Sequence, residues 1–110
     1  MGNLREKAKA GAQLSYAASG GTGSYQAFSG TLTETTPVLI FDNQTSVPVS
    51  ISDDGITTWK TFSAGEALVL DLNTNHDKQA TILSWPIGTQ FYANSAAGTG
   101  SFYISPVYTQ

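Results

Sequence analysis

The residues with the clearest chemical potential lie in one polar stretch of the chain. His76 is the single histidine, next to Asp77 and five residues after Asp71. A histidine beside carboxylates could act as a general base or as a metal ligand. A catalytic triad also needs an oriented nucleophile and an oxyanion site, and no flanking Ser or Thr has nucleophile-elbow context. We therefore interpret His76 as a solvated loop residue, and we predict no catalytic residues.

Acidic residues suggest two further chemistries. Residues 53–55 (Asp-Asp-Gly) resemble the start of a calcium loop, because hard cations favour carboxylate oxygens. A calcium loop continues with further oxygen ligands, whereas residues 56–59 are Ile-Thr-Thr-Trp, so Asp-Gly instead predicts a hairpin turn. Glu34 and Glu66 lie on separate segments, and the sequence cannot test whether they form a glycosidase-like pair. We expect no metal and no cofactor.

Aromatic side chains could form a sugar-binding platform. The candidates are Trp59, Trp85, Tyr92, Tyr103 and Tyr108. Aromatic residues in strands more often fill cores and interfaces between subunits. A carbohydrate-binding module is therefore a less favoured hypothesis.

Charge is scarce in this chain and unevenly distributed. Only 12% of the 110 residues are charged, against about one quarter in typical soluble domains. Three of the five basic residues, Arg5, Lys7 and Lys9, fall in the first nine positions. A free monomer relies on surface charge for solubility. The charge-poor remainder therefore predicts a protein whose surface is covered by neighbouring molecules.

Length and composition limit the class of protein. A chain of 110 residues can form one domain with one modest core. The absence of Cys excludes disulfides and fits synthesis in a reducing cytoplasm, where the glycosylation pattern at residues 43–45 (Asn-Gln-Thr) is an accidental match. The apolar runs are far shorter than the roughly 20 residues of a membrane span, and residues 1–23 lack a signal-peptide core. The net charge of −3 argues against a dedicated nucleic-acid binder. We expect a soluble protein with no membrane partner and no specific nucleic-acid partner.

The N-terminal residues differ from the rest in their pattern. Residues 3–10 have helix-forming composition without an apolar face, and residues 11–23 are mostly small and polar. Such segments bury too little apolar surface to offset the entropy of ordering. The sequence predicts an arm over residues 1–23 that is flexible or ordered only on a partner.

Residues 24–110 have the pattern of strands. The apolar run 38–41 suggests a strand buried on both faces, and the alternation at 47–51 suggests a strand with one wet face. Pro48 cannot donate a ladder hydrogen bond, which places that strand at an edge. Further strands are expected at 25–32, 56–62, 68–72, 82–87, 90–94 and 101–108. About eight strands at this spacing predict an all-β fold, an antiparallel β-sandwich or jelly-roll-like domain.

Residues 38–110 carry a series of segments that resembles a known class of proteins. In chain order, the segments are residues 40–45 (Ile-Phe-Asp-Asn-Gln-Thr), 47–49 (Val-Pro-Val), 52–55 (Ser-Asp-Asp-Gly), Trp59, 64–65 (Ala-Gly), 68–72 (Leu-Val-Leu-Asp-Leu), 86–92 (Pro-Ile-Gly-Thr-Gln-Phe-Tyr) and 98–105 (Gly-Thr-Gly-Ser-Phe-Tyr-Ile-Ser). This stretch is similar to small virion structural proteins of tailed bacteriophages, encoded among the head-assembly genes. The resemblance implies a capsid-associated β-sandwich and carries no catalytic residues.

The resemblance implies a non-enzymatic capsid cement (decoration) protein. Such a protein would be made in the bacterial host cytoplasm and located in the phage head, where a homo-oligomer, expected as a trimer, bridges subunits of the major capsid protein. We expect capsid contacts from the basic residues of the arm: Arg5, Lys7 and Lys9. We expect the seam between subunits at Pro48, Phe102, Tyr103 and Tyr108. The alternative is a neck, tail or fibre-adaptor subunit of the virion.

Overall fold

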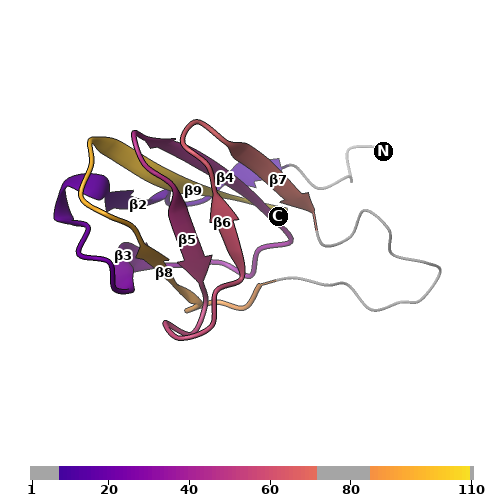
Figure 1. The fold of residues 1–110 in the computed structure, drawn as a ribbon. Coiled ribbons are helices and arrows are strands. Elements are labelled where there is room, and N and C mark those ends of the chain that lie inside the picture. The colour runs from indigo at the N-terminus through magenta and orange to yellow at the C-terminus, as the bar shows by residue number, and fades with distance from the viewer. Residues whose placement is uncertain (1–7, 72–84, 110) are drawn as a thin grey trace, which may run out of the picture.

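The computed structural model describes residues 8–71 and 85–109, which form two antiparallel sheets packed face to face (Figure 1). The expected all-β sandwich is therefore confirmed. The described residues hold nine strands and one short 3-10 helix, η2 (Ala18–Gly20). The strands are β1 (Ala8–Ala10), β2 (Leu14–Ala17), β3 (Gln26–Thr31), β4 (Val38–Thr45), β5 (Val49–Ser52), β6 (Lys60–Phe62), β7 (Ala67–Asp71), β8 (Gln90–Asn94) and β9 (Gly100–Thr109).

Strand order assigns the edges of the two sheets. In the five-stranded sheet the order is β1-β9-β4-β7, and β2 also pairs with β9. Strands β1 and β2 pair with residues 107–109 and 101–104 of β9, so they lie end to end along one side of it. The four-stranded sheet has the order β3-β8-β5-β6. The edges are thus β1 with β2 and β7 in one sheet, and β3 and β6 in the other.

The core lies between the sheets and is dominated by phenylalanines. Phe41, Phe62, Phe91 and Phe102 are almost completely buried. The Phe62 and Phe102 rings meet edge to face at 5.1 Å, and those of Phe41 and Phe62 stack at 5.6 Å. Aromatic pairs at these distances contribute beyond the area that they bury. A single aromatic core therefore joins the two layers.

Strand β4 corrects the prediction of a strand buried on both faces. Leu39 and Phe41 are fully buried in the core, whereas Val38 and Ile40 are only half-buried. Side chains alternate between the two faces of a strand, and one face of this sheet has no layer over it among the described residues. The apolar run therefore supplies both the core and an apolar outer face.

Residues 8–23 belong to the sandwich, which corrects the prediction of an arm up to residue 23. Leu14, Tyr16 and Ala18 are buried, and the Tyr16 hydroxyl lies 2.8 Å from Ser95 Oγ. The Ala18 carbonyl accepts a hydrogen bond from Gly98 N–H. The apolar residues of this segment are few, but β9 gives them a strand to pair with and a core to enter. Residues 1–7 lie outside the described residues.

Two further expectations change around β5. This strand lies between β8 and β6, so it is not the edge that Pro48 suggested. Pro48 precedes the first paired residue, and its missing N–H therefore costs no ladder bond. The turn after β5 is also wider than a tight hairpin, because pairing resumes only at Lys60. The expected strand over 56–62 is thus shortened to three residues.

Candidate assembly surface

The structure separates the residues predicted to form the seam between subunits. Phe102 is fully buried in β9 with a paired strand on each side, so it cannot contact another subunit. Tyr103 is half-buried on the opposite, outer face of the same strand, and Pro48 is exposed in the β4–β5 connection. Lys9 and Tyr108 are paired in the backbone register of β1 and β9. The side chains of Lys9 and Tyr108 lie outside the described part of the structure. Arg5 and Lys7 belong to residues 1–7, which also lie outside it.

The structure gives no catalytic or metal-binding role to the described residues that were considered for one. His76 and Asp77 lie outside the described residues. Asp54 Oδ1 accepts hydrogen bonds from the N–H groups of Thr57 and Ile56, both at 2.8 Å, and from the Ser52 hydroxyl. These bonds lower the pKa of Asp54 to about 2, the bond from Thr57 having the largest effect. The carboxylate therefore organises the loop between β5 and β6.

The aromatic candidates do not form one platform. The Trp59 ring packs at 5.3 Å from Phe41, and the Trp85 ring at 5.4 Å from Phe91, so both indoles cover the core. Tyr92 lies on the outer face of the four-stranded sheet, whereas Tyr103 lies on the outer face of the other. Tyr108 lies outside the described side chains.

The outer face of the five-stranded sheet carries an apolar cluster, which we define as Val38, Ile40, Val69 and Val107. In the strand register, Val69 is opposite Ile40, and Val38 is opposite Val107. Val69 is 62% exposed. Directly opposite residues on one face have Cβ atoms about 4.5–5.5 Å apart. Val38 and Ile40 are next to each other on the outer face of β4, so the two pairs form one group. An exposed apolar area of this kind is suited to contact with another molecule.

Among the described strands, β7 forms the edge of the sheet beside this cluster. Asn43 bonds to residues 65–66 in both directions: its N–H donates to the Glu66 carbonyl, and its own carbonyl accepts from Gly65 N–H. The backbone N–H and C=O groups of successive residues in a strand point to opposite sides. Asn43, Phe41 and Leu39 therefore direct their backbone groups towards β7. The register therefore turns the N–H and C=O groups of Ala67 and Val69 away from β4. No described strand pairs with this side of β7.

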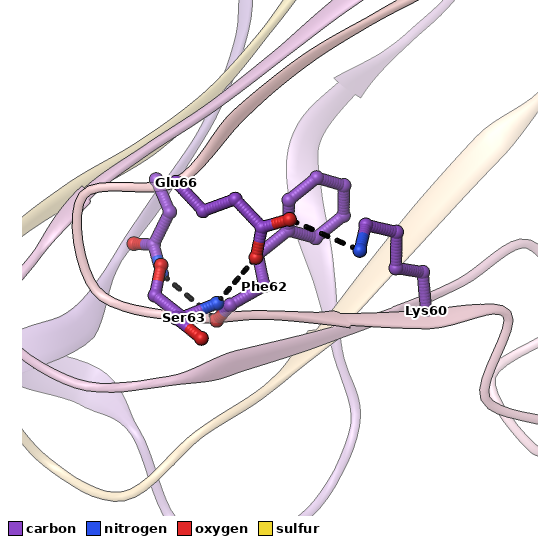
Figure 2. A network of polar contacts seen from close by, with 5 residues as sticks. Lys60, Phe62, Ser63 and Glu66 are labelled. Carbon is purple, nitrogen blue, oxygen red and sulfur yellow. Dashed lines mark hydrogen bonds and ion pairs between the residues drawn. The ribbon is translucent and has the colours of Figure 1, made fainter.

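A polar network around Glu66 fixes the turn that leads into β7 (Figure 2). Glu66 Oε1 accepts from Ser63 N–H at 2.9 Å, and Oε2 lies 3.1 Å from Lys60 Nζ. The ammonium group of Lys60 also lies 4.9 Å from the centroid of the Phe62 ring. The pKa of Glu66 is lowered, first by the bond from Ser63 and then by the bond from Lys60. The strand thus starts from an anchored turn.

Asn43 holds this turn from the inside. It is fully buried, and its Nδ2 lies 3.0–3.2 Å from the carbonyl oxygens of Val47, Phe62 and Ser63. Its Oδ1 accepts from both the N–H and the hydroxyl of Thr45. One side chain therefore connects the β4–β5 connection to the start of the β6–β7 turn. Burial of Asn43 also keeps the glycosylation pattern out of reach in the folded protein.

The edge position of β7 and the buried role of Asn43 were not predicted from the sequence. The alternation of Leu68 and Leu70 predicted the strand, but only the sheet order shows that it lies at an edge.

Comparison with protein-family models, with curated proteins and with solved structures found no match for this chain. In the described part of the chain, no helix is long and apolar enough to cross a membrane.

Proposed function

We propose that this chain is a non-enzymatic structural subunit of a bacteriophage virion, a cement (decoration) protein bound to the capsid. The resemblance over residues 38–110 supports the virion class. The structural observation that supports shell binding is the outer face of the five-stranded sheet, where the apolar cluster lies beside the half-buried side chains of Tyr103 and Ser105. Contact through the cluster itself takes no charged side chain out of water, which would be costly, and Asp42 and Asp71 are the charged neighbours beside it on this face.

The proposed mechanism is mechanical. Packaged DNA puts the shell under pressure, and the shell is weakest where capsid subunits meet. A rigid sandwich bound across two subunits of the major capsid protein adds buried area at that point. Contacts of about 800 Å² per partner suffice for stable association. Several copies bound together strengthen one another without any new contact.

The basic residues at the N-terminus supply a second part of this proposal. Arg5, Lys7 and Lys9 contrast with the acidic balance of the remaining chain. We propose that they contact acidic patches on the capsid, while the outer face makes the apolar contact. Deleting residues 2–7 removes Arg5 and Lys7 without touching the described sandwich. Lower occupancy on shells with unchanged thermal stability would support this division, and unchanged occupancy would contradict it.

Copy number in purified virions tests the proposed function. A cement protein is present in the order of hundreds of copies, whereas a neck or tail ring is a single closed ring and holds about six or twelve. Quantitative mass spectrometry against labelled peptides of this chain measures the ratio to the major capsid protein. Ring-like copy numbers would favour the neck or tail alternative. Absence of the chain from virions would exclude both.

A further inference from the structure

Within the described residues, strand β7 lacks the features that protect the other edges. Edge strands in soluble proteins are commonly kept short, interrupted, or marked by Lys, Pro or a bulge, because unpaired backbone groups attract other strands. Strand β6 has three residues including Lys60, β3 has a register shift between Ala27 and Thr31, and β1 and β2 are two short pieces. Strand β7 is five residues long (Ala-Leu-Val-Leu-Asp), with none of these features. Its central residue, Val69, is 62% exposed.

We propose that β7 pairs antiparallel with β7 of a second copy, across a twofold axis that passes beside Val69. The strand is self-complementary in this register. Val69 faces the partner's Val69, and Leu68 faces the partner's Leu70. Ala67 faces the partner's Asp71, so no like charges are opposed. The five-stranded sheet then continues into the same sheet of the second copy.

Three features of the described residues favour this occupant. The outward N–H and C=O of Val69 exchange hydrogen bonds with the partner's Val69, the main-chain pairing by which a strand is added to a sheet edge. The apolar clusters of both copies join into one apolar area on the outer face. On the inner side, the half-buried Leu68 and Leu70, which pack against the core, also face their counterparts in the second copy.

The proposed contact sets the symmetry of the assembly. An isologous contact gives dimers and even-numbered assemblies, whereas the sequence analysis expected a trimer. One pair of five-residue strands buries less than the roughly 1,200 Å² of standard stable interfaces, so free protein should dimerise weakly. Copies held side by side on a surface would pair more readily. The contact does not rest on the proposed capsid function, and it is tested on the free protein.

Charge at residue 69 provides a specific test with the full chain. Sedimentation velocity up to about 1 mM covers the weak end of the affinity range. We expect a monomer–dimer equilibrium for the wild type. Val69→Lys and Val69→Glu should each be monomeric, because like charges directly opposite destabilise a strand pair. An equimolar mixture of the two variants should dimerise again. The controls are Val69→Thr, which keeps a β-branched side chain, and Ile56→Lys at an 83% exposed loop position, and both should dimerise like the wild type.

A cross-link tests the register independently. The chain has no Cys, so Val69→Cys introduces a single thiol. A hydrogen-bonded antiparallel pair has its Cα atoms about 5.5 Å apart, within the usual disulfide range. Mild oxidation should convert this variant to a covalent dimer, faster than it converts Ile56→Cys.

Several results would overturn the proposal. They are a wild type that stays monomeric at the highest concentration, a trimer, a Val69→Lys variant that still dimerises, or a charge-reversed mixture that stays monomeric. Hydrogen exchange then distinguishes the causes. Protected Val69 amides in a monomer would mean that the chain covers its own edge, and exposed ones would mean that the edge is simply solvated.

Discussion

Replacing Asn43 by Asp tests whether one buried amide holds the turn into β7. The change exchanges the Nδ2 amide group for an oxygen that faces the carbonyl oxygens of Val47, Phe62 and Ser63 at 3.0–3.2 Å. The amide has two hydrogens, so two hydrogen bonds are lost. The Val47 and Ser63 oxygens each keep another donor, the Thr45 hydroxyl and the Glu66 N–H. Each lost bond costs about 0.5–1.5 kcal/mol, so the two lower the free energy of unfolding by about 1–3 kcal/mol, and the buried charge lowers it further. Since domains of this kind are stable by about 5–15 kcal/mol, the variant should still fold.

The sign of the pH effect follows from the same geometry. A carboxylate buried against carbonyl oxygens has a pKa above its unfolded value, because burial and the carbonyl dipoles disfavour the charged form. The variant's loss of stability is therefore largest above the folded pKa. It becomes smaller as the pH falls towards the unfolded value of about 3.9. Urea unfolding at pH 7 and pH 4.5, followed by fluorescence of Trp59 and Trp85, measures the difference.

Asn94→Asp is the matched control for this experiment. Asn94 lies half-buried on the outer face of β8, so the same chemical change there should cost less than about 0.5 kcal/mol. A loss below about 1 kcal/mol for Asn43→Asp at pH 7 would refute the role of the amide, because it is less than two lost hydrogen bonds cost. A loss equal to that of Asn94→Asp, or one that grows as the pH falls, would also refute it.

Two further predictions concern loops. The pKa of Asp54 lies at about 2 in the folded protein against 3.8 for the free group, so its contribution to stability is present above pH 4 and is lost as the pH falls towards 2. In Asp54→Asn the melting temperature should fall less between pH 4 and pH 2 than it does in the wild type. An equal fall in both proteins would contradict this explanation. Gly100→Ala should prevent stable folding, because φ is +81° and the added Cβ would collide with the Gln44 carbonyl. Gly65→Ala is its control: φ is +82° with open space around it, so the cost should be about 1–2 kcal/mol, and equal losses would show that the collision is unimportant.

Local pattern predicted the strands well where the strand itself carries the signal. Strand β8 lies at the expected residues 90–94, and β9 covers the expected residues 101–108. The alternation of side chains along β9 puts Phe102 and Ile104 on one face. It could not show which face enters the core, so Phe102 was wrongly assigned to a seam between subunits.

Long-range pairing explains what the sequence could not predict. Leu14 pairs with Ile104, and residues separated by most of the chain leave no local signal of their partnership. Residues 8–23 therefore resembled an arm, although they form one edge of a sheet. Likewise, β7 is an edge and β5 is not, because the strand order places them there. The buried role of Asn43 depends on two loops meeting around it, which only the fold brings about.

A cryo-EM map of the intact virion tests the proposed function most directly. We predict density for the sandwich where capsid subunits meet, repeated over the whole shell, with the apolar cluster of the five-stranded sheet facing the capsid. A complementary binding measurement uses empty shells, on which Tyr103→Asp should lower occupancy more than the exposed loop change Ile56→Asp. A map without this chain on the shell, or one in which the outer face points into solvent and makes no contact, would contradict the proposal.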